Sequence, residues 1–426
     1  MVLATFVISI FLFLLLGVPI AFSILMTIVV LVSTSGVSSY AIVPTYLYSG
    51  VNSFSLMAIP FFTLCGELMN AGNLSQGIVD FCRCLLGHIK AGLGYAAILA
   101  CMMFACLSGA AVITVSAIGG IMLPLLIQEG YDSSDSTAVV CAGSITGPII
   151  PPSIPMVVYG VISGVSVTKM FVAGVVPGLL MGFLCMFTWW LMNRKRDYPV
   201  QPKATAREMA AATKKAFPAL MMPIIMMGGI LSGIFTPTEA GVVACVYAYL
   251  VSKFLYRKMS LADLKKAVLA AAKSSAVVMF VVASTQALGM VITVARIPQM
   301  IAEAINSVSS NPYVIMCLID IFILGVGLFM DVVPALTIVA PIFLPIAVGA
   351  GMDPIVFGMT MIFGLVIGLI TPPVGNVLYI GCGISKIPLL SLLKRIYPMV
   401  IVYIAILFLI TFCPGLITFL PNLVMG

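Results

Sequence analysis

Two stretches of the chain combine glycine with a Pro-Pro pair: SITGPIIPPSIP (144–155) and LVIGLITPPVGN (365–376). In each, a glycine stands four residues before the first proline, at Gly147 and at Gly368. Proline has no amide N–H, and its ring displaces the carbonyl four residues earlier. Both glycine carbonyls are therefore expected to be free of helical hydrogen bonds. Because hard cations prefer oxygen ligands, the two stretches predict two cation sites, with Na+ as the ion.

Side chains that could complete such sites lie close to both stretches. Ser153 follows the first Pro-Pro pair, and Thr371 and Asn376 flank the second. An upstream segment is expected to face each stretch, and there Ser108 and Gly325 are the polar or flexible points. A structural role is as plausible for each of these residues, since glycine and proline are common in membrane helices.

A few charged residues stand inside apolar sequence, where charge is costly and often functional. Asp331 begins a short apolar segment and could support a cation site or cap a helix N-terminus. Arg296 ends an apolar run and could hold a carboxylate with two hydrogen bonds or extend to the membrane interface. Glu239 follows Thr236 at capping distance, so a helix cap is the simpler interpretation.

The elements that must position these residues are membrane helices. Of the 426 residues, 62% are hydrophobic and 8% are charged, whereas soluble domains carry about 25% charged residues. A crossing needs about 20 apolar residues. We expect ten or eleven crossings plus several half-length segments, with one long first helix over 4–32. Full-length apolar runs occupy 4–32, 55–71, 91–107, 168–193, 216–233, 237–256, 274–294, 312–330 and 396–413.

Charge and cysteine content narrow the class of protein further. The net charge of +7 comes largely from two basic segments, 194–215 and 257–273. Basic loops remain in the cytoplasm, which predicts a multi-pass protein of a bacterial inner membrane. The eleven cysteines are scattered, and the single histidine, His88, has no ligand partners at suitable spacing. Since no phosphate-binding loop or catalytic constellation is present, an enzyme or transport ATPase is not expected.

An internal repeat relates the two stretches. Shifting the chain by 221 residues superimposes glycines, prolines and one aspartate of the two halves. The matched pairs are Pro124/Pro345, Gly130/Gly351, Asp132/Asp353, Gly147/Gly368, Pro151/Pro372, Pro152/Pro373, Gly160/Gly381 and Pro177/Pro398. Internal repeats that carry broken helices in matching positions are typical of secondary transporters and point to the binding site.

The chain resembles a known family over essentially its whole length. IIPPSIPMVVYG (149–160), FVAGVVPGLLMG (171–182), MDVVPALTIVAPIFLP (330–345) and TPPVGNVLY (371–379) are similar to the large membrane subunit of tripartite ATP-independent periplasmic (TRAP) transporters. That resemblance implies an all-α polytopic fold like that of the ion transporter superfamily, with two re-entrant helical hairpins in inverted repeats. It also implies elevator motion of a transport domain against a scaffold.

The resemblance divides the chain into four parts. Residues 1–90 would form scaffold and arm helices, and 194–310 would form basic cytoplasmic loops and further scaffold helices. Residues 91–193 and 311–426 would be the two transport-domain repeats, each with a hairpin and a broken helix. Two sodium sites are carried over from the family, largely through carbonyls: Ser108, Gly147, Ile150 and Pro152, and Gly325, Gly368, Thr371 and Val374.

Partners and solute also follow from the resemblance. We expect a separate small four-helix membrane subunit and a periplasmic binding protein that delivers an organic acid. One plausible arginine, Arg296, favours a monocarboxylic sugar acid such as sialic acid (N-acetylneuraminate) over a C4-dicarboxylate. Asp331, Asn376 and Ser153 are the other candidates for solute contact or coupling. A proton-coupled organic-anion antiporter remains the alternative, supported by Asp331 and Glu239, whereas a passive channel or structural scaffold would show a continuous polar helix face.

Overall fold

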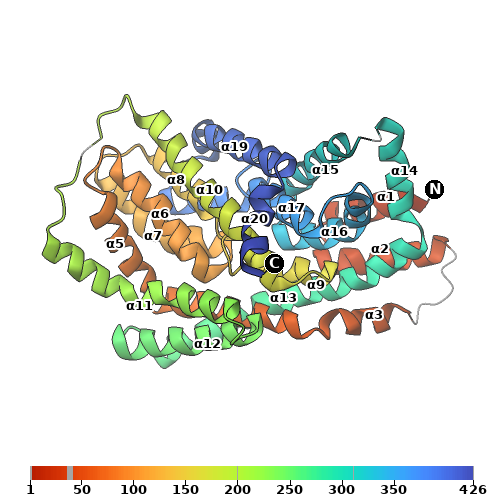
Figure 1. Cartoon of the computed structure of the whole chain (residues 1–426), viewed down its shortest axis with the longest axis horizontal. Coiled ribbons are helices and arrows are strands. Elements are labelled where there is room, and N and C mark those ends of the chain that lie inside the picture. The colour runs from red at the N-terminus through yellow and green to blue at the C-terminus, as the bar shows by residue number, and fades with distance from the viewer. Residues whose placement is uncertain (1, 36–41, 199, 310, 426) are drawn as a thin grey trace.

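A computed structural model describes residues 2–35, 42–198, 200–309 and 311–425, and within these ranges every regular element is helical (Figure 1). The elements of the first half are α1 (Val2–Leu15), α2 (Ile20–Ser35), α3 (Ile42–Val51), the 3-10 helix η1 (Phe54–Met57), α4 (Ala58–Ala71), α5 (Leu74–Leu86), α6 (Gly92–Ser108), α7 (Ala111–Gln128), α8 (Ser133–Ser144), α9 (Ile154–Ser163) and α10 (Val167–Asn193).

The second half contains α11 (Ala206–Leu231), α12 (Pro237–Leu250), the π-helix η2 (Val251–Leu255), α13 (Leu261–Val294), α14 (Ile297–Val308), α15 (Pro312–Gly327), α16 (Val332–Gly349), α17 (Pro354–Gly368), α18 (Asn376–Ser385), α19 (Leu389–Phe412) and α20 (Gly415–Met425). Three of these helices, α11, α12 and α13, begin with a capping box in which a Ser or Thr and an acidic side chain satisfy each other's backbone amides.

The expectation of one long first helix is wrong. The apolar run 4–32 forms two helices, α1 and α2, which pack against each other. Gly17 between them has a φ of +77°, and Pro19 cannot donate a helical hydrogen bond. Glycine and proline therefore decide where this apolar run turns, and each of the two helices is shorter than the 18 residues of a full crossing.

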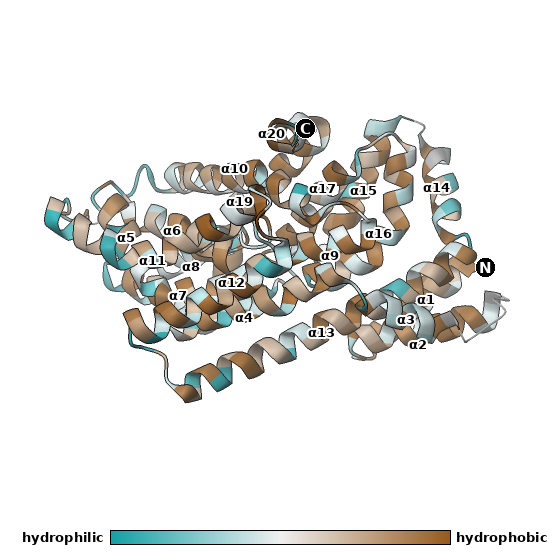
Figure 2. Ribbon diagram, turned by 60° about the horizontal axis from the view of Figure 1, so that its bottom comes forward, coloured by the Kyte–Doolittle hydropathy of each residue, from teal (hydrophilic) through white to brown (hydrophobic). Residues whose placement is uncertain are grey.

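Eight described helices are long and apolar enough to cross a membrane, fewer than the ten or eleven crossings expected. Several expected crossings are shorter than 18 residues, since glycine and proline interrupt the apolar runs. The eight are Phe54–Ala71, Ala111–Gln128, Val167–Asn193, Ala206–Leu231, Pro237–Leu255, Leu261–Val294, Val332–Gly349 and Leu389–Phe412. The chain is thus a polytopic membrane protein, as Figure 2 illustrates by its predominantly apolar ribbon.

The internal repeat is confirmed at the level of helices. The offset of 221 residues carries α7 onto the bounds of α16, and it places α8, α9 and α10 within a few residues of α17, α18 and α19. The Pro151–Pro152 and Pro372–Pro373 peptide bonds are both cis. The two halves therefore share secondary structure as well as glycine and proline positions.

Each repeat contains a helical hairpin and a separate broken helix. In the first repeat α6 and α7 pack together and are joined by only two residues, Gly109 and Ala110. The Pro-Pro stretch instead separates α8 from α9: α8 packs on α6 and α7, whereas α9 packs mainly on α16, α10 and α17. In the second repeat α15 and α16 form the hairpin, and α17 and α18 are the two parts of the broken helix.

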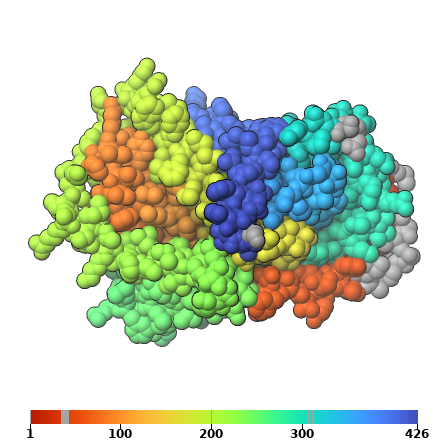
Figure 3. Space-filling view, in the orientation of Figure 1, coloured from red at the N-terminus to blue at the C-terminus, as the bar shows by residue number. Residues whose placement is uncertain are grey.

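One helix of each repeat packs against the other repeat. Helix α9 of the first repeat lies against α16 of the second, and α18 of the second lies against α7 of the first. On the face shown in Figure 3, the C-terminal helix α20 covers the junction of the repeats, where it contacts α10, α17 and α19. The helices that follow both breaks therefore lie where the two repeats interlock.

The remaining helices pack around this body. Helix α13, which has 34 residues, contacts α2, α3 and α4 and also reaches α16 of the second repeat. In Figure 2 it runs along the lower edge of the molecule, beneath α4 and α9. Helices α11 and α12 pack on α5 and α4 respectively.

Candidate functional site

The tip of the first hairpin lies against the first break. A Cβ added at Gly147 would stand 3.0 Å from the carbonyl carbon of Ala110. A Cβ added at Gly109, whose φ is +59°, would stand 2.9 Å from the carbonyl oxygen of Pro152. A side chain at Gly109 would clash and would be strained by the positive φ, and one at Gly147 would force the Ala110 backbone to shift by a few tenths of an ångström. The structure thus brings the Ser108 end of α6 together with Gly147 and Pro152, as the sequence suggested.

Several polar groups at this contact are fully buried. The Ser108 hydroxyl lies 2.8 Å from that of Thr114, and the Ser153 hydroxyl donates to the carbonyl of Pro148 at 2.5 Å. The hydrogen bonds of the described residues leave the carbonyl of Gly147 without a donor. Buried polar groups normally have partners. A cation at the tip would supply one for Gly147.

Ile150 closes the last turn before the first Pro-Pro pair. Its amide donates to the Thr146 carbonyl at 2.8 Å, which closes one helical turn ahead of the Pro-Pro pair. Its side chain lies where a Cβ on Gly178 of α10 would be, so the break also packs closely on α10.

At the second break the close neighbour is not the residue expected from sequence. Gly368 packs backbone to backbone on Gly327, the last residue of α15, so a Cβ on Gly368 would overlap the carbonyl of Gly327. Gly325 lies one half-turn earlier, with no atom near the position of a Cβ. Val374, by contrast, does meet the hairpin tip, because its amide donates to the Leu328 carbonyl at 3.3 Å.

The Gly368 carbonyl is not free. It accepts the Thr371 amide at 3.1 Å, and the Thr371 hydroxyl donates to the Ile367 carbonyl at 2.8 Å. Pro372 has no N–H to donate, so the chain tightens into a turn in which the Thr371 amide donates to the Gly368 carbonyl instead. The prediction of a carbonyl free of hydrogen bonds is therefore confirmed for Gly147 and wrong for Gly368.

Asp331 and Asn376 meet at the second break. Asp331 is the N-cap of α16, where its carboxylate accepts the Val332 amide at 2.7 Å. The same carboxylate interacts with the side chain of Asn376, the first residue of α18. A negative charge and an amide oxygen thus lie together beside the hairpin tip, where either could contact a cation or a hydrogen-bonding solute.

Two other charged candidates lie elsewhere. Arg296 is exposed between α13 and α14 with a φ of +55°, and no described contact joins it to either break. Glu239 forms a capping box with Thr236 at the start of α12. The simpler interpretation of Glu239 is therefore confirmed. Arg296 follows an apolar run, and this pattern does not indicate the direction in which the helix points.

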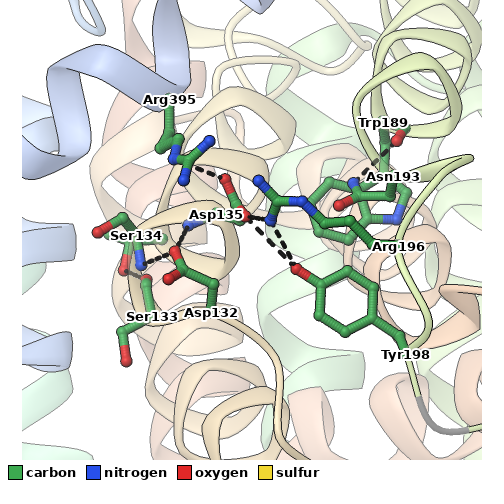
Figure 4. Close-up of polar contacts among 10 residues, drawn as sticks. Asp132, Ser133, Ser134, Asp135, Trp189, Asn193, Arg196, Tyr198 and Arg395 are labelled. Atoms are coloured by element: carbon green, nitrogen blue, oxygen red, sulfur yellow. Dashed lines mark hydrogen bonds and ion pairs between the residues drawn. The ribbon is translucent and has the colours of Figure 1, made fainter.

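A buried ion-pair cluster that the sequence did not reveal anchors α8 (Figure 4). Asp135 is fully buried near the start of that helix and forms ion pairs with Arg196 and with Arg395 of α19. The Tyr198 hydroxyl also donates to its carboxylate, at 3.4 Å. The acidic segment 129–136 and the basic loop after α10 thus lie on one side of the molecule.

Aromatic rings continue this cluster. Tyr131 stacks on Tyr198 with centroids 4.2 Å apart and also lies parallel to Trp189 of α10. Burial raises the pKa of Tyr131 to about 12, and burial is also the main cause of the raised pKa of Tyr198. Both phenols therefore stay neutral at physiological pH. The Arg196 guanidinium, bonded to Tyr198 and Asp135, has a raised pKa and stays charged.

The described residues contain no group of three or more His, Cys, Asp or Glu side chains placed to hold a metal ion. The oxygen atoms at the breaks are instead backbone carbonyls, hydroxyls, an amide and one carboxylate. Such a set suits a weakly polarising cation better than a transition metal.

Comparison with known proteins agrees with this architecture. Residues 7–416 match the family described as "Tripartite ATP-independent periplasmic transporter, DctM component". The chain is similar to the 2,3-diketo-L-gulonate TRAP transporter large permease protein YiaN of Escherichia coli, with 41% identity over 94% of each chain. It is 38% identical to the C4-dicarboxylate permease DctM of Pseudomonas aeruginosa, over 92% of each, and 33% identical to the sialic acid permease SiaM of Vibrio cholerae, over 96% of each.

The fold also resembles a solved structure, that of the Alcanivorax borkumensis YdaH transporter, described as having an unusual topology. The TM-score is 0.60 at 13% identity, covering 87% of this chain and 88% of the other. With its apolar helices and its match along almost the whole chain, this multi-pass inner-membrane protein belongs to the DctM family, the large permease component of TRAP transporters, which carry out secondary transport of organic acids.

Proposed function

We propose that the chain imports an organic acid by coupling its movement to Na+, with an elevator-like motion of the two repeats. The observation that carries the proposal is the contact made twice between a hairpin tip and a break, at Gly147 against Ala110 and at Gly368 against Gly327. A cation bound there would hold tip and break together, which is how ion occupancy could control solute binding between them.

The two sites would differ in their ligands. At the first, the free Gly147 carbonyl and buried Ser108 hydroxyl are available, the Pro152 carbonyl lies against Gly109, and the Ile150 carbonyl is the fourth proposed ligand. At the second, Thr371 and Val374 belong to the break, and Asp331 and Asn376 add a charge and an amide. The two sites are therefore not chemical copies of each other.

Several solutes remain candidates. The named relatives are described as permeases for 2,3-diketo-L-gulonate, a C4-dicarboxylate and sialic acid. Arg296 lies away from both breaks, so it gives no reason to prefer a solute with one carboxylate to a solute with two. We propose a monocarboxylic sugar acid, with sialic acid as the first test and a C4-dicarboxylate as the alternative, because two of the three named solutes are sugar acids.

Two partners complete the proposed system. A tripartite transporter requires a small membrane subunit and a periplasmic binding protein besides this component. In the proposed motion, residues 91–193 and 311–426 move as the transport domain. Residues 1–90 and 194–310 remain as scaffold, with α13 facing α16 across the sliding surface.

Solute uptake into liposomes tests the proposal. The vesicles hold this chain and its small membrane subunit, and the binding protein and radiolabelled sialic acid are added outside, with an inward Na+ gradient or with choline instead. Uptake that needs both Na+ and the binding protein supports the proposal. Uptake that proceeds in choline and follows pH would favour the proton-coupled antiporter. Failure with sialic acid but success with a C4-dicarboxylate would change the solute alone.

A further inference from the structure

A second buried carboxylate lies away from both breaks. Asp320 stands in the middle of α15 and has no exposed surface. One carboxylate oxygen, Oδ1, has no hydrogen-bond partner. No ion pair involves Asp320 in the part of the chain that the structure describes. An isolated charge in such surroundings would be costly, so buried carboxylates are paired, neutral or bound to a ligand.

The single partner of Asp320 favours a neutral group. Its Oδ2 lies 2.7 Å from the hydroxyl of Thr411 on α19, and this hydroxyl also lies 2.9 Å from the Leu407 carbonyl. A threonine hydroxyl has one hydrogen to donate. When Thr411 donates that hydrogen to Leu407, as helical threonines commonly do, Asp320 must itself be the donor. A carboxyl group donates only when it carries a proton.

Thr411 also connects Asp320 to a cavity. The cavity has a volume of about 390 Å³ and is lined by Thr411, by Met316 and by the turn around Gly351. Met316 lies four residues before Asp320, on the same face of α15. Water in this cavity can reach the Thr411 hydroxyl and, through it, the buried carboxylate.

Among the described residues, the groups that face Asp320 from its neighbours include no cation. Cys317 lies close on α15 itself, and Asp353 of α17 lines the same cavity. Tyr313 of α15 lies 5.9 Å, ring to ring, from Phe412 of α19. The basic residues of α19 stand near its other end, where Arg395 is about 24 Å from Thr411 along the helix.

We propose that Asp320 is a proton-binding site of the second repeat, supplied through this cavity. Two carboxylate oxygens and one hydroxyl are too few ligands for a metal cation, which needs about six, but a proton needs only one donor and one acceptor. Arg395 marks the end of α19 that lies beside the basic loop, so Thr411 is at the opposite end. The positive-inside rule assigns that end to the periplasm.

Proton binding at Asp320 would make transport sensitive to external pH. With the proton, Asp320 and Thr411 hold α15 to α19. Without it, a buried charge would draw water from the cavity and loosen this contact, and α15 carries the second hairpin tip. The position corresponding to Asp320 in the first repeat is Leu99, so this property belongs to one repeat only.

Infrared spectroscopy of the purified full chain tests the site directly, with no need for transport. A band of a protonated carboxyl group should be present in the wild type and lost in Asp320→Asn. Asp353→Asn is the matched control, because it removes the other carboxylate of the cavity while asparagine still caps α17. A wild-type band that survives Asp320→Asn, or is lost in Asp353→Asn instead, would overturn the proposal.

Uptake gives the second readout, and for this readout alone the inference depends on the proposed function. At a fixed Na+ gradient, external pH is varied from about 5 to about 9, the range in which a perturbed carboxyl group titrates. The wild type and Asp353→Asn should change rate with pH, and Asp320→Asn should remain active with a flat profile. An unchanged pH profile in Asp320→Asn would refute the proton site while leaving Na+ coupling intact.

Discussion

At Gly147 a single methyl group would disturb the first hairpin tip. The Cβ of Gly147→Ala would stand 3.0 Å from the carbonyl carbon of Ala110 and 3.1 Å from its oxygen, tighter than nine in ten Cβ contacts in proteins, so the backbone at Ala110 would have to shift by a few tenths of an ångström. We expect the tip to move, and the Na+ concentration that half-saturates uptake to rise about tenfold, which corresponds to about 1.4 kcal/mol. Sodium-dependent uptake in proteoliposomes measures this change.

Gly120 provides the matched control for that substitution. It lies on α7 of the same hairpin, and no atom lies within 4 Å of the position of its Cβ. Gly120→Ala should leave Na+ dependence unchanged and slightly stabilise the helix. Equal effects of the two substitutions on half-saturation would contradict a special role for the tip.

Asp331 allows its helix-capping role to be separated from its charge. Asparagine caps helices about as well as aspartate, so Asp331→Asn should fold with a thermal midpoint close to the wild type. Because the charge beside Asn376 is lost, uptake at low Na+ should fall about tenfold or more, the effect of one charge-assisted interaction. Wild-type uptake in this variant would restrict Asp331 to capping.

At the scale of the element, α8 depends on its buried anchor. Asp135→Asn removes a charge shared by Arg196 and Arg395. Both arginines are partly exposed and can regain water, so the free energy of unfolding should fall by only about 1–3 kcal/mol. Thermal unfolding in detergent measures the loss. Asp132→Asn, in the same turn but exposed and still a cap, should lose little.

The aromatic stack beside α8 predicts a loss of stability in alkali. The folded pKa of Tyr131 is about 12, above the value of about 10 in an unfolded chain. The folded form therefore holds its proton after the unfolded form has lost it, and stability falls as pH rises from about 10 to 12. Tyr131→Phe should show a shallower decline over that range in thermal unfolding. A slope equal to that of the wild type would contradict the shift.

The sequence predicted these elements unevenly, for physical reasons. The repeat, the breaks and the cap at Asp331 follow from local backbone chemistry, which glycine, proline and aspartate express directly. Two other features depend on how the helices pack. Gly368 contacts Gly327 rather than Gly325, and Asp135 pairs with residues that are 61 and 260 positions away along the chain. No local pattern encodes a partner at that distance. The same holds for Asp320, whose isolation from any ion pair among the described residues depends on helix packing.

At the scale of the whole molecule, the proposed sliding motion can be blocked. The Cβ position of Gly289 on α13 lies 3.8 Å from that of Pro341 on α16, the usual Cβ separation in a disulfide. In a background without native cysteines, cross-linking Gly289→Cys to Pro341→Cys should stop uptake, and a reductant should restore it. Uptake by the cross-linked protein would show that α13 and α16 do not move apart during transport.

A cross-link from the same helix to another scaffold element serves as control. Gly50 on α3 approaches Gln286 on α13, with 2.9 Å between the Cβ positions, so the two helices must move apart by about 1 Å to reach the usual Cβ separation of a disulfide. Both helices belong to the part proposed to stay fixed, so Gly50→Cys with Gln286→Cys should cross-link without stopping uptake. Inhibition by both cross-links would point to general rigidity rather than to sliding.

The exchange of α9 and α18 between the repeats connects each proposed ion site, whose ligands lie in one half of the chain, to the hairpin of the other half. The second part of each broken helix rests on the other half's hairpin. An ion that tightens one break therefore pulls on the hairpin that forms the other. Occupancy of the two sites should then be thermodynamically linked, each ion raising the affinity for its counterpart, so that the pair fills in a narrow range of Na+ concentration rather than as two independent events.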